Sequence, residues 1–208
     1  MVLNNKYDED VKNHKPTFKT LTRVYNDIEE YGVVSTTNFA EGWMCPLYIK
    51  KDRRDIANYR LITLLYSYYK IFTKALAVKL AKKVPAIIHE SQAGFIPERR
   101  IFDQVKLTKL VVNYAETVEE NGTIIALDQE QACDKITCDY LCKTLAKYNL
   151  PANFIATVKS LYENAETKVM INGVLSSPFK VSRGVWQGDP MSCLLFDIVI
   201  SQNSELYY

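Results

Sequence analysis

The chain has 208 residues, 48% of them hydrophobic, and its 26 Lys and Arg nearly balance its 24 Asp and Glu. This composition excludes a disordered tail, and because no apolar run reaches about 18 residues we expect no membrane-spanning helix. Residues 1–19 lack the apolar stretch of a secretion signal and the five cysteines form no C-x-x-C pair, so we expect an intracellular protein, nuclear or cytoplasmic, with reduced thiols.

The pattern of apolar residues predicts a mixed α+β fold. Helices are expected where apolar residues recur every three or four positions and a stop signal such as Gly32 follows. The predicted helices cover 17–31, 66–83, 101–120, 137–148, 151–163 and 191–206. The predicted strands cover 44–50, 123–127, 167–171 and 174–182, with polar loops at 51–58, 91–100 and 184–190.

Three of these elements carry more detailed predictions. Pro46 should keep the strand 44–50 near a sheet edge, because proline lacks the amide that a central strand donates. Asn172-Gly173 predicts a tight hairpin, since a type I′ turn needs positive φ at both central residues. In the helix 66–83 we expect one face to point inward, namely Ile71, Ala75, Val78 and Leu80.

Positive charge is concentrated in one part of the chain. Residues 50–83 hold 10 basic and 2 acidic groups, a net charge of +8, whereas the flanking parts are net acidic. A solvated helix face and a set of phosphate contacts both explain such a block, and charge does not decide between them. Tyrosines lie among these cations, an arrangement that suits nucleic acid.

Asp128 is a candidate for catalysis because it ends a predicted buried strand, 123–127, and faces a loop. A helix-capping or loop aspartate is the simpler interpretation. A carboxylate in this position also suits Mg²⁺, which binds one or two carboxylates together with phosphate oxygens. Metal ions held in this way drive phosphoryl transfer to a hydroxyl group.

The loop 183–190 is the second candidate site. It holds Gln187 between Val185-Trp186 and Gly188, and glycines let the backbone approach a ligand closely. A tight turn in which Asp189 caps the following helix explains the end of the loop. It does not explain the glutamine.

Four segments, in order and with matching spacing, resemble the reverse transcriptase of non-LTR (LINE-type) retrotransposons. The consensus sequences of these segments in the family are N-Y-R-P-I-S-L-L…Y-K-I, Q-x-G-F-x-P-G-R, L-D-x-x-K-A-[FY]-D, and I-N-G followed by R-G-V-R-Q-G-D-P-L-S-P-L-L-F. The matching segments here are 58–71, 92–99, 127–134, and 171–173 with 183–196.

This resemblance implies the fingers and part of the palm of a right-hand polymerase, with Asp128 as the first catalytic, Mg²⁺-binding aspartate. It implies nucleotide-binding roles for seven further positions. Lys50 or Lys51, with Arg60, would contact the incoming triphosphate, and Arg99 the template or a phosphate. Gln187 and Gly188 would line the nucleotide pocket, and Cys133 would occupy the steric-gate position. RNA template, DNA primer and dNTPs are the implied partners, while the oligomeric state stays open.

The sequence also departs from the family pattern. The second catalytic motif, aromatic-Ala-Asp-Asp, does not occur, and Cys133 stands where the family has Phe or Tyr. We therefore expect a chain truncated before that hairpin and before the thumb, with a helical extension at 1–42, a fingers-like part at 43–122 and a partial palm at 123–208. Such a fragment is expected not to catalyse nucleotidyl transfer by itself. A non-catalytic RNA- or DNA-binding remnant using the basic fingers face is the alternative.

Overall fold

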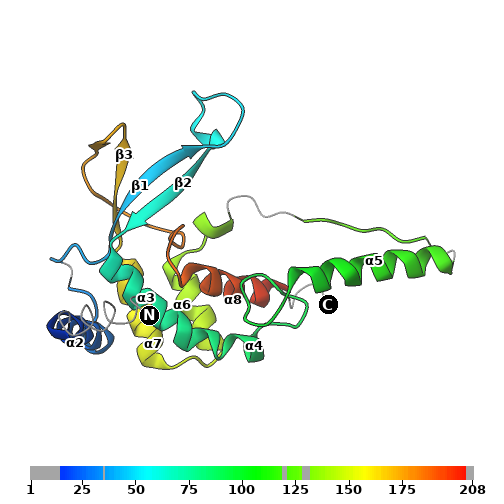
Figure 1. The fold of residues 1–208 in the computed structure, drawn as a ribbon, viewed down its shortest axis with the longest axis horizontal. Helices are drawn as coiled ribbons and strands as arrows, with labels where there is room; N and C mark the ends of the chain where they lie inside the picture. The colour runs from blue at the N-terminus through cyan, green and yellow to red at the C-terminus, as the bar shows by residue number, and fades with distance from the viewer. Residues whose placement is uncertain (1–14, 35, 119–120, 128–131, 205–208) are drawn as a thin grey trace, which may run out of the picture.

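The computed structural model describes residues 15–34, 36–118, 121–127 and 132–204, which combine helices with a five-stranded sheet (Figure 1). The helices are α2 (Lys15–Tyr31), α3 (Ser67–Ala81), α4 (Val84–Ile87), α5 (Ile101–Thr117), α6 (Cys138–Lys147), α7 (Ala152–Glu163) and α8 (Ser192–Ser204). The strands are β1 (Glu41–Tyr48), β2 (Tyr59–Leu65), β3 (Glu166–Ile171), β4 (Val174–Leu175) and β5 (Phe179–Lys180), with 3₁₀ turns η1 (Ile56–Asn58) and η2 (Ala132–Asp134). The predicted α+β class is confirmed.

Strand β1 lies at the centre of the sheet. It pairs antiparallel with β2 along its length and parallel with β3 over Glu41–Met44. Pro46 lies beyond that parallel register, so among the described strands the second half of β1 pairs with β2 alone, although β3 continues to Ile171 and there pairs with β4. The prediction that Pro46 keeps this strand near a sheet edge is therefore wrong, because β1 lies between β2 and β3, and proline is accommodated at a position outside the parallel pairing. Strand β2 was not predicted, although its sequence is rich in apolar residues.

The hairpin after β3 has the predicted turn. Asn172 and Gly173 have φ of 51° and 80°, as a type I′ turn requires, and Ile171 pairs with Val174 across it. The helices predicted at 17–31, 137–148 and 151–163 correspond to α2, α6 and α7, and each agrees within a few residues. In the described part of the chain, no helix is both long and apolar enough to span a membrane.

The helix predicted at 66–83 corresponds to α3, but its inward face is wrong in three of four positions. Leu80 is buried, whereas Ile71 and Val78 are about half exposed and Ala75 is exposed. The helix is apolar on more than one side, so periodicity does not single out the face that meets the core. The side chains that are buried instead are Tyr69, Phe72, Thr73, Leu76 and Ala77.

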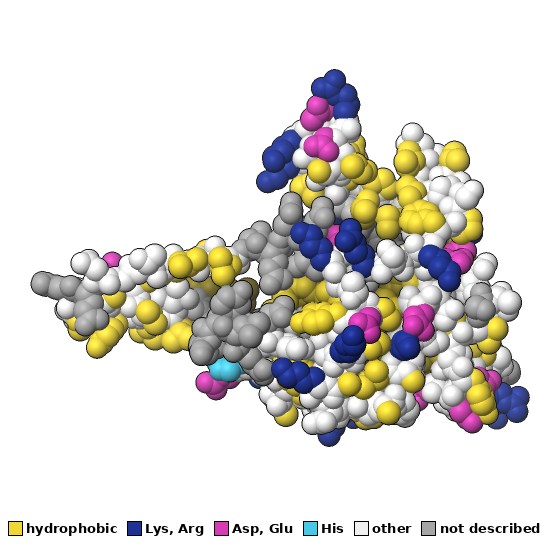
Figure 2. Space-filling view, turned by 180° about the vertical axis from the view of Figure 1, so that it is seen from behind, with side chains coloured by type: hydrophobic (Ala, Val, Ile, Leu, Met, Phe, Trp, Pro, Cys, Tyr) yellow, Lys and Arg dark blue, Asp and Glu magenta, His cyan; other side chains and the backbone are white. Residues whose placement is uncertain are grey.

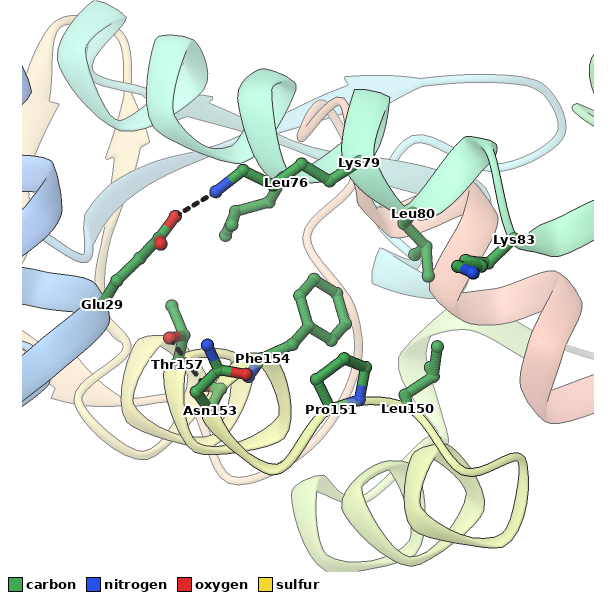
Figure 3. Close-up of a pocket in the computed structure, with 10 residues that line it drawn as sticks. All are labelled: Glu29, Leu76, Lys79, Leu80, Lys83, Leu150, Pro151, Asn153, Phe154 and Thr157. Atoms are coloured by element: carbon green, nitrogen blue, oxygen red, sulfur yellow. Dashed lines mark hydrogen bonds and ion pairs between the residues drawn. The ribbon is translucent and has the colours of Figure 1, made fainter.

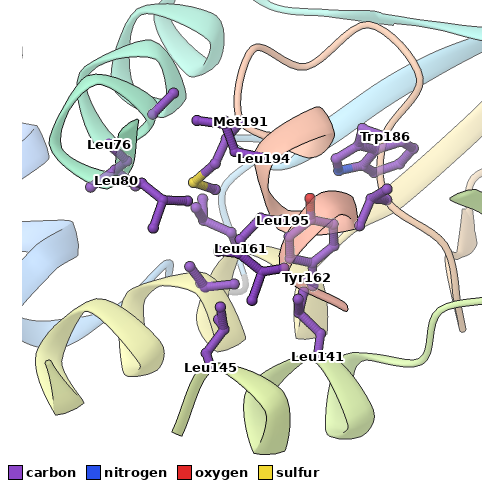
Figure 4. Packing of buried hydrophobic residues seen from close by; sticks show 14 of the residues in the cluster. Leu76, Leu80, Leu141, Leu145, Leu161, Tyr162, Trp186, Met191, Leu194 and Leu195 are labelled. Carbon is purple, nitrogen blue, oxygen red and sulfur yellow. The ribbon is translucent and has the colours of Figure 1, made fainter. Parts of the chain in front are cut away.

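The hydrophobic core lies where α3, α6, α7 and α8 meet (Figure 4). Leucines from these helices are almost completely buried, and Met191 and Trp186, from the segment that leads into α8, pack with them. The loop 183–190 is therefore anchored to the hydrophobic core. The buried leucines are Leu76, Leu80, Leu141, Leu145, Leu161 and Leu195.

The predicted buried strand at 123–127 is wrong. Residues 121–127 form no regular secondary structure, and Ile124, Ile125 and Leu127 are 66%, 75% and 78% exposed. A strand forms only where a neighbour takes up its backbone hydrogen bonds, and no described strand pairs with this segment. Asp128, predicted at its end, lies outside the described residues.

Helix α5 extends away from the other helices (Figure 1), and none of its residues is buried. Together with 124–127 it presents an exposed apolar surface far larger than scattered single residues give. The exposed apolar side chains of α5 are Ile101, Phe102, Val105, Leu107, Leu110, Val111 and Tyr114.

We expect the 208-residue chain to self-associate through this surface. Replacing Leu110 by Glu should lower the weight-average mass in sedimentation at micromolar concentration, because a charge on the apolar face opposes burial against a second copy. Asn113→Glu adds the same charge at an exposed polar position of α5 and should lower the weight-average mass less. A wild-type chain that stays monomeric and melts in one sharp transition would contradict the prediction.

Candidate functional site

The loop 183–190 connects β5 to α8 and lies directly against β2. The amide of Thr63, in β2, donates a hydrogen bond to the carbonyl of Gln187 at 3.0 Å. Gly188 follows with φ of 116°, and a Cβ atom there would lie 2.9 Å from the carbonyl oxygen of Thr63. Position 188 thus demands glycine for both its backbone angle and its closeness to the strand.

The start of the loop is fixed against η2. The amide of Gly184 donates to the carbonyl of Ile136 at 2.6 Å, and the amide of Val185 donates to the carbonyl of Cys133 at 2.9 Å. Gly184 has φ of 96°, and a Cβ atom there would lie 3.2 Å from the Cα of Asp134. The loop therefore joins β2 to the η2 turn and sets the distance between them.

Gln187 turns its side chain toward η2. Its Nε2 donates to Oδ1 of Asp134 at 3.2 Å, while its carbonyl is held by Thr63. Both ends of this half-buried residue are thereby fixed. Asp134 was not among the predicted site residues, although it closes the segment 127–134 that carries part of the resemblance.

A cleft of about 640 Å³ opens between the β1–β2 hairpin and this loop. Two cationic side chains, Arg60 and Arg183, line it together with Asp134 and Gln187. Both arginines are exposed, and within the described residues neither joins an ion pair. The apolar side chains lining the cleft are Met44, Ile49, Ile56, Leu61, Val181, Val185 and Trp186. A site with apolar walls and two cations suits an organic anion.

Lys50 and Lys51 lie at the tip of the β1–β2 hairpin, and both are exposed. Figure 2 shows the dark blue side chains gathered at this tip. Arg54 is held there by Asp52 at 2.8 Å. The cleft lining includes neither lysine, so the structure places these predicted residues beside the cleft and not inside it.

Arg99 is engaged within its own segment. Its guanidinium donates to four carbonyls, those of His89, Gln92, Pro85 and Ile88, at 2.6 to 3.1 Å. These bonds hold the segment 85–99 together. The structure does not bring Arg99 to the cleft, and a contact with template or phosphate would compete with these carbonyls.

Cys133 is the central residue of η2 and is half-buried. Burial raises the pKa of its thiol, and nearby Asp134, Cys193 and Asp197 raise it further, so the thiol is neutral near pH 7. Its side chain does not line the cleft. The assignment of this position as a steric gate stays a prediction.

Two buried acids flank the start of α8. Asp189 is 5% exposed, and its Oδ2 accepts from the amide of Met191 and the hydroxyl of Ser192, both at 3.3 Å, so its carboxylate binds the turn that leads into α8, which begins at Ser192. Asp197 is 3% exposed, and burial raises its pKa to about 7. Gln92 donates to its Oδ1 at 3.4 Å. No sequence pattern had singled out Asp197.

The described residues do not form a Mg²⁺ site. Among them, no three His, Cys, Asp or Glu side chains are placed to share a metal ion. Asp134, the carboxylate in the cleft, is bound by Gln187. The predicted ligand, Asp128, lies outside the described residues.

A second cavity, of about 210 Å³, lies between α2, α3 and α7 (Figure 3). Glu29 and Lys79 form an ion pair across its mouth at 2.6 Å, and Leu76 and Phe154 line its interior. It is built from elements other than those of the cleft. None of the predicted site residues lines it.

Comparison with known proteins matches this chain to a family model. Residues 49–208 match the model described as "Reverse transcriptase (RNA-dependent DNA polymerase)". This range includes the β1–β2 hairpin tip, the loop 183–190 and every residue that lines the cleft except Met44.

Curated relatives agree with the family match. The chain is 36% identical over 151 residues to the transposon TX1 uncharacterized 149 kDa protein of Xenopus laevis, covering 73% of this chain and 12% of that protein. It is 32% identical over 111 residues to the R2DM retrotransposon polyprotein of Drosophila melanogaster, covering 53% and 10%. It is 29% identical over 148 residues to the probable RNA-directed DNA polymerase from transposon X-element of the same fly, covering 70% and 16%.

The chain therefore belongs to the reverse transcriptase family, in its non-LTR, LINE-type branch. It spans about an eighth of the length of the TX1 relative, and similarly small parts of the other two.

Gly188→Ala should lower the free energy of unfolding by about 2 kcal/mol, because the methyl group is strained at positive φ and meets the carbonyl of Thr63. Gly122→Ala is the matched control, since nothing lies within 4 Å of its Cβ position. Urea unfolding followed by the fluorescence of Trp43 and Trp186 measures both. Equal midpoints for the two variants would contradict the account of the loop.

Asp197 predicts a pH dependence of stability. Its pKa is raised from 3.8 to about 7 in the folded chain, so the folded state holds the proton more tightly than the unfolded state does. The contribution of Asp197 to the free energy of unfolding is fully present below about pH 4. It falls as the pH rises to 7, by up to about 4 kcal/mol in all.

Asp197→Asn removes the titrating group and should stabilise the chain more at pH 8 than at pH 5. Urea unfolding at the two pH values measures the difference. A gain that is the same at both would show that the carboxyl is not buried in its neutral form.

Proposed function

We propose that the chain supplies the fingers and part of the palm of a reverse transcriptase, with residues 43–122 as the fingers-like part and 123–208 as the partial palm. Residues 1–42 would be an extension that precedes them and includes α2. The observation that carries this proposal is the cleft in which Arg60, from the first part, faces Gln187, from the second. A cleft between two parts of a chain is a common place for a ligand.

The chemistry of the cleft suits an incoming dNTP. Arg60 would contact the triphosphate, since guanidinium groups bind phosphate oxygens in pairs of hydrogen bonds. Gln187, held by Asp134 and Thr63, and Gly188 would line the pocket for the nucleotide and its template base. Lys50 and Lys51 would meet phosphates from the hairpin tip. RNA template and DNA primer are the proposed partners.

The transfer reaction requires divalent metal, which in this family we take to be Mg²⁺. We assign Asp128 as one ligand, in line with the preference of this ion for carboxylates and phosphate oxygens. A single carboxylate does not fix two metal ions, and the sequence holds no aromatic-Ala-Asp-Asp motif to supply others. We therefore propose that this chain does not catalyse nucleotidyl transfer by itself.

A non-catalytic role in binding RNA or DNA is the second candidate. The observation that favours it is the exposed basic tip of the β1–β2 hairpin, which needs no metal to attract phosphates. This role uses the same cations as the first proposal but no chemistry. A test of activity therefore checks the proposed inactivity, and a test of binding checks the role of the tip.

We expect no primer extension when the chain is incubated with an RNA template, a DNA primer, dNTPs and Mg²⁺. The same chain should bind the primer–template, with an affinity that falls steeply between low and moderate salt because phosphate contacts release counterions. Lys50→Ala with Lys51→Ala should weaken binding and flatten this salt dependence. Lys106→Ala with Lys109→Ala, in α5, removes the same charge elsewhere and is the control.

Template-dependent extension by the wild-type chain would overturn the proposed inactivity. Binding that is absent, or unaffected by salt, would overturn the binding role. If the α5 control weakened binding as much as the tip variant, the assignment of Lys50 and Lys51 would fail.

A further inference from the structure

The tip of the β1–β2 hairpin is held by two tyrosine hydroxyls. The hydroxyl of Tyr48 donates to the carbonyl of Lys51 at 2.6 Å. The hydroxyl of Tyr59 donates to the carbonyl of Arg53 at 2.8 Å. Both acceptors belong to basic residues of the tip, so each hydroxyl fixes the backbone from which a cation projects.

The two tyrosines support each other. Tyr48 and Tyr59 are direct partners in the antiparallel register of β1 and β2, and their rings meet edge to face with centroids 5.6 Å apart. The guanidinium carbon of Arg53 lies 4.8 Å from the centroid of the Tyr48 ring. The two rings thus pack together at the last residue pair of β1 and β2, and Arg53 of the tip lies over the ring of Tyr48.

The conformation of the tip is one that the chain does not adopt readily without such support. Lys51 has φ of 72°, in the left-handed region that side chains other than glycine rarely occupy. Backbone angles of this kind persist where the surrounding contacts impose them. The bond from Tyr48 ends on the carbonyl of this same residue.

Charge at the tip is left available for a ligand. Asp52 is bound by Arg54, and Asp55 accepts a hydrogen bond from the amide of Ala57 at 2.9 Å. Within the described residues, no ion pair involves Lys50, Lys51 or Arg53. Three exposed cations therefore project from a loop whose backbone is already ordered.

We infer that Tyr48 and Tyr59 are positioning residues, which hold the basic tip in the conformation that binds the phosphates of a nucleic-acid strand. This inference rests on the proposed function. An ordered loop loses less conformational entropy when it binds, and this raises affinity without any new contact. The tyrosines act through the lysines and Arg53 and need not touch the strand.

The test uses the 208-residue chain and a fluorescein-labelled oligouridylate, with affinity measured by anisotropy over a series of salt concentrations. Tyr48→Phe and Tyr59→Phe, separately and together, remove the hydroxyls but keep the rings and the net charge. We expect the double variant to bind about 5-fold more weakly, with a salt slope lower by about one. Tyr114→Phe, at an exposed site of α5, should bind like the wild type.

A second pair of variants separates geometry from charge. Lys51→Gly and Lys51→Ala lose the same cation, but glycine adopts φ of 72° freely, whereas alanine does not. We expect the glycine variant to bind about 3-fold more tightly than the alanine variant, because the other tip cations stay in place. This comparison holds even if the tyrosine variants unfold, which circular dichroism would show.

Equal affinities for the two Lys51 variants, with wild-type binding by the tyrosine variants, would overturn the positioning role. If Lys50→Ala with Lys51→Ala still weakened binding, the proposed function would stand without it. If the lysine variants also bound like the wild type, the tip would not contact phosphates, and the binding assignment of the proposed function would fail as well.

Discussion

The arrangement of the cleft depends on the backbone hydrogen bonds of the loop 183–190. At one end the loop is tied to Thr63 in β2, and at the other to η2 and Ile136, through backbone amide and carbonyl groups that every residue except proline supplies in full. Gly184 and Gly188 make both approaches possible, since a Cβ atom at either position would meet backbone. The burial of Trp186 and Met191 then attaches the loop to the helical core. The loop therefore fixes the positions of the β1–β2 hairpin, η2 and α8 relative to one another.

The sequence predicted correctly those elements whose conformation depends on neighbouring residues in the chain. Asn172-Gly173 sets its own backbone angles, and the apolar spacing in α6 and α7 fits a helix wherever it packs. The buried face of α3 and the strand 123–127 were predicted wrongly because they depend on neighbours: α3 offers two apolar sides, and an apolar run becomes a strand only beside a partner. Strand β2 was not predicted although its partner β1 was, because its apolar residues lie in adjacent pairs, Leu61-Ile62 and Leu64-Leu65, and do not alternate with polar ones.

The candidate site shows the same division. The motifs pointed to Arg60 and Gln187, and the structure brings both to one cleft. They did not reveal that Asp134 holds the amide of Gln187, because the two residues are 53 positions apart and meet only through the fold. Asp197 carries no pattern at all, and its raised pKa arises from burial alone.

The basic block of residues 50–83 supports both of its interpretations, in different places. Its second half lies on and just after α3, where Lys74, Lys82 and Lys83 are exposed and Lys79 pairs with Glu29, as on a solvated helix face. Its first half forms the hairpin tip, where tyrosine hydroxyls order the backbone beneath the cations. The net charge of residues 50–83 adds the cations of both halves together, so it does not show which of them are free to bind a ligand. What distinguishes a cation poised for a ligand is an ordered backbone below it and no competing partner within the chain, and Arg99, bound by four carbonyls, is the contrasting case.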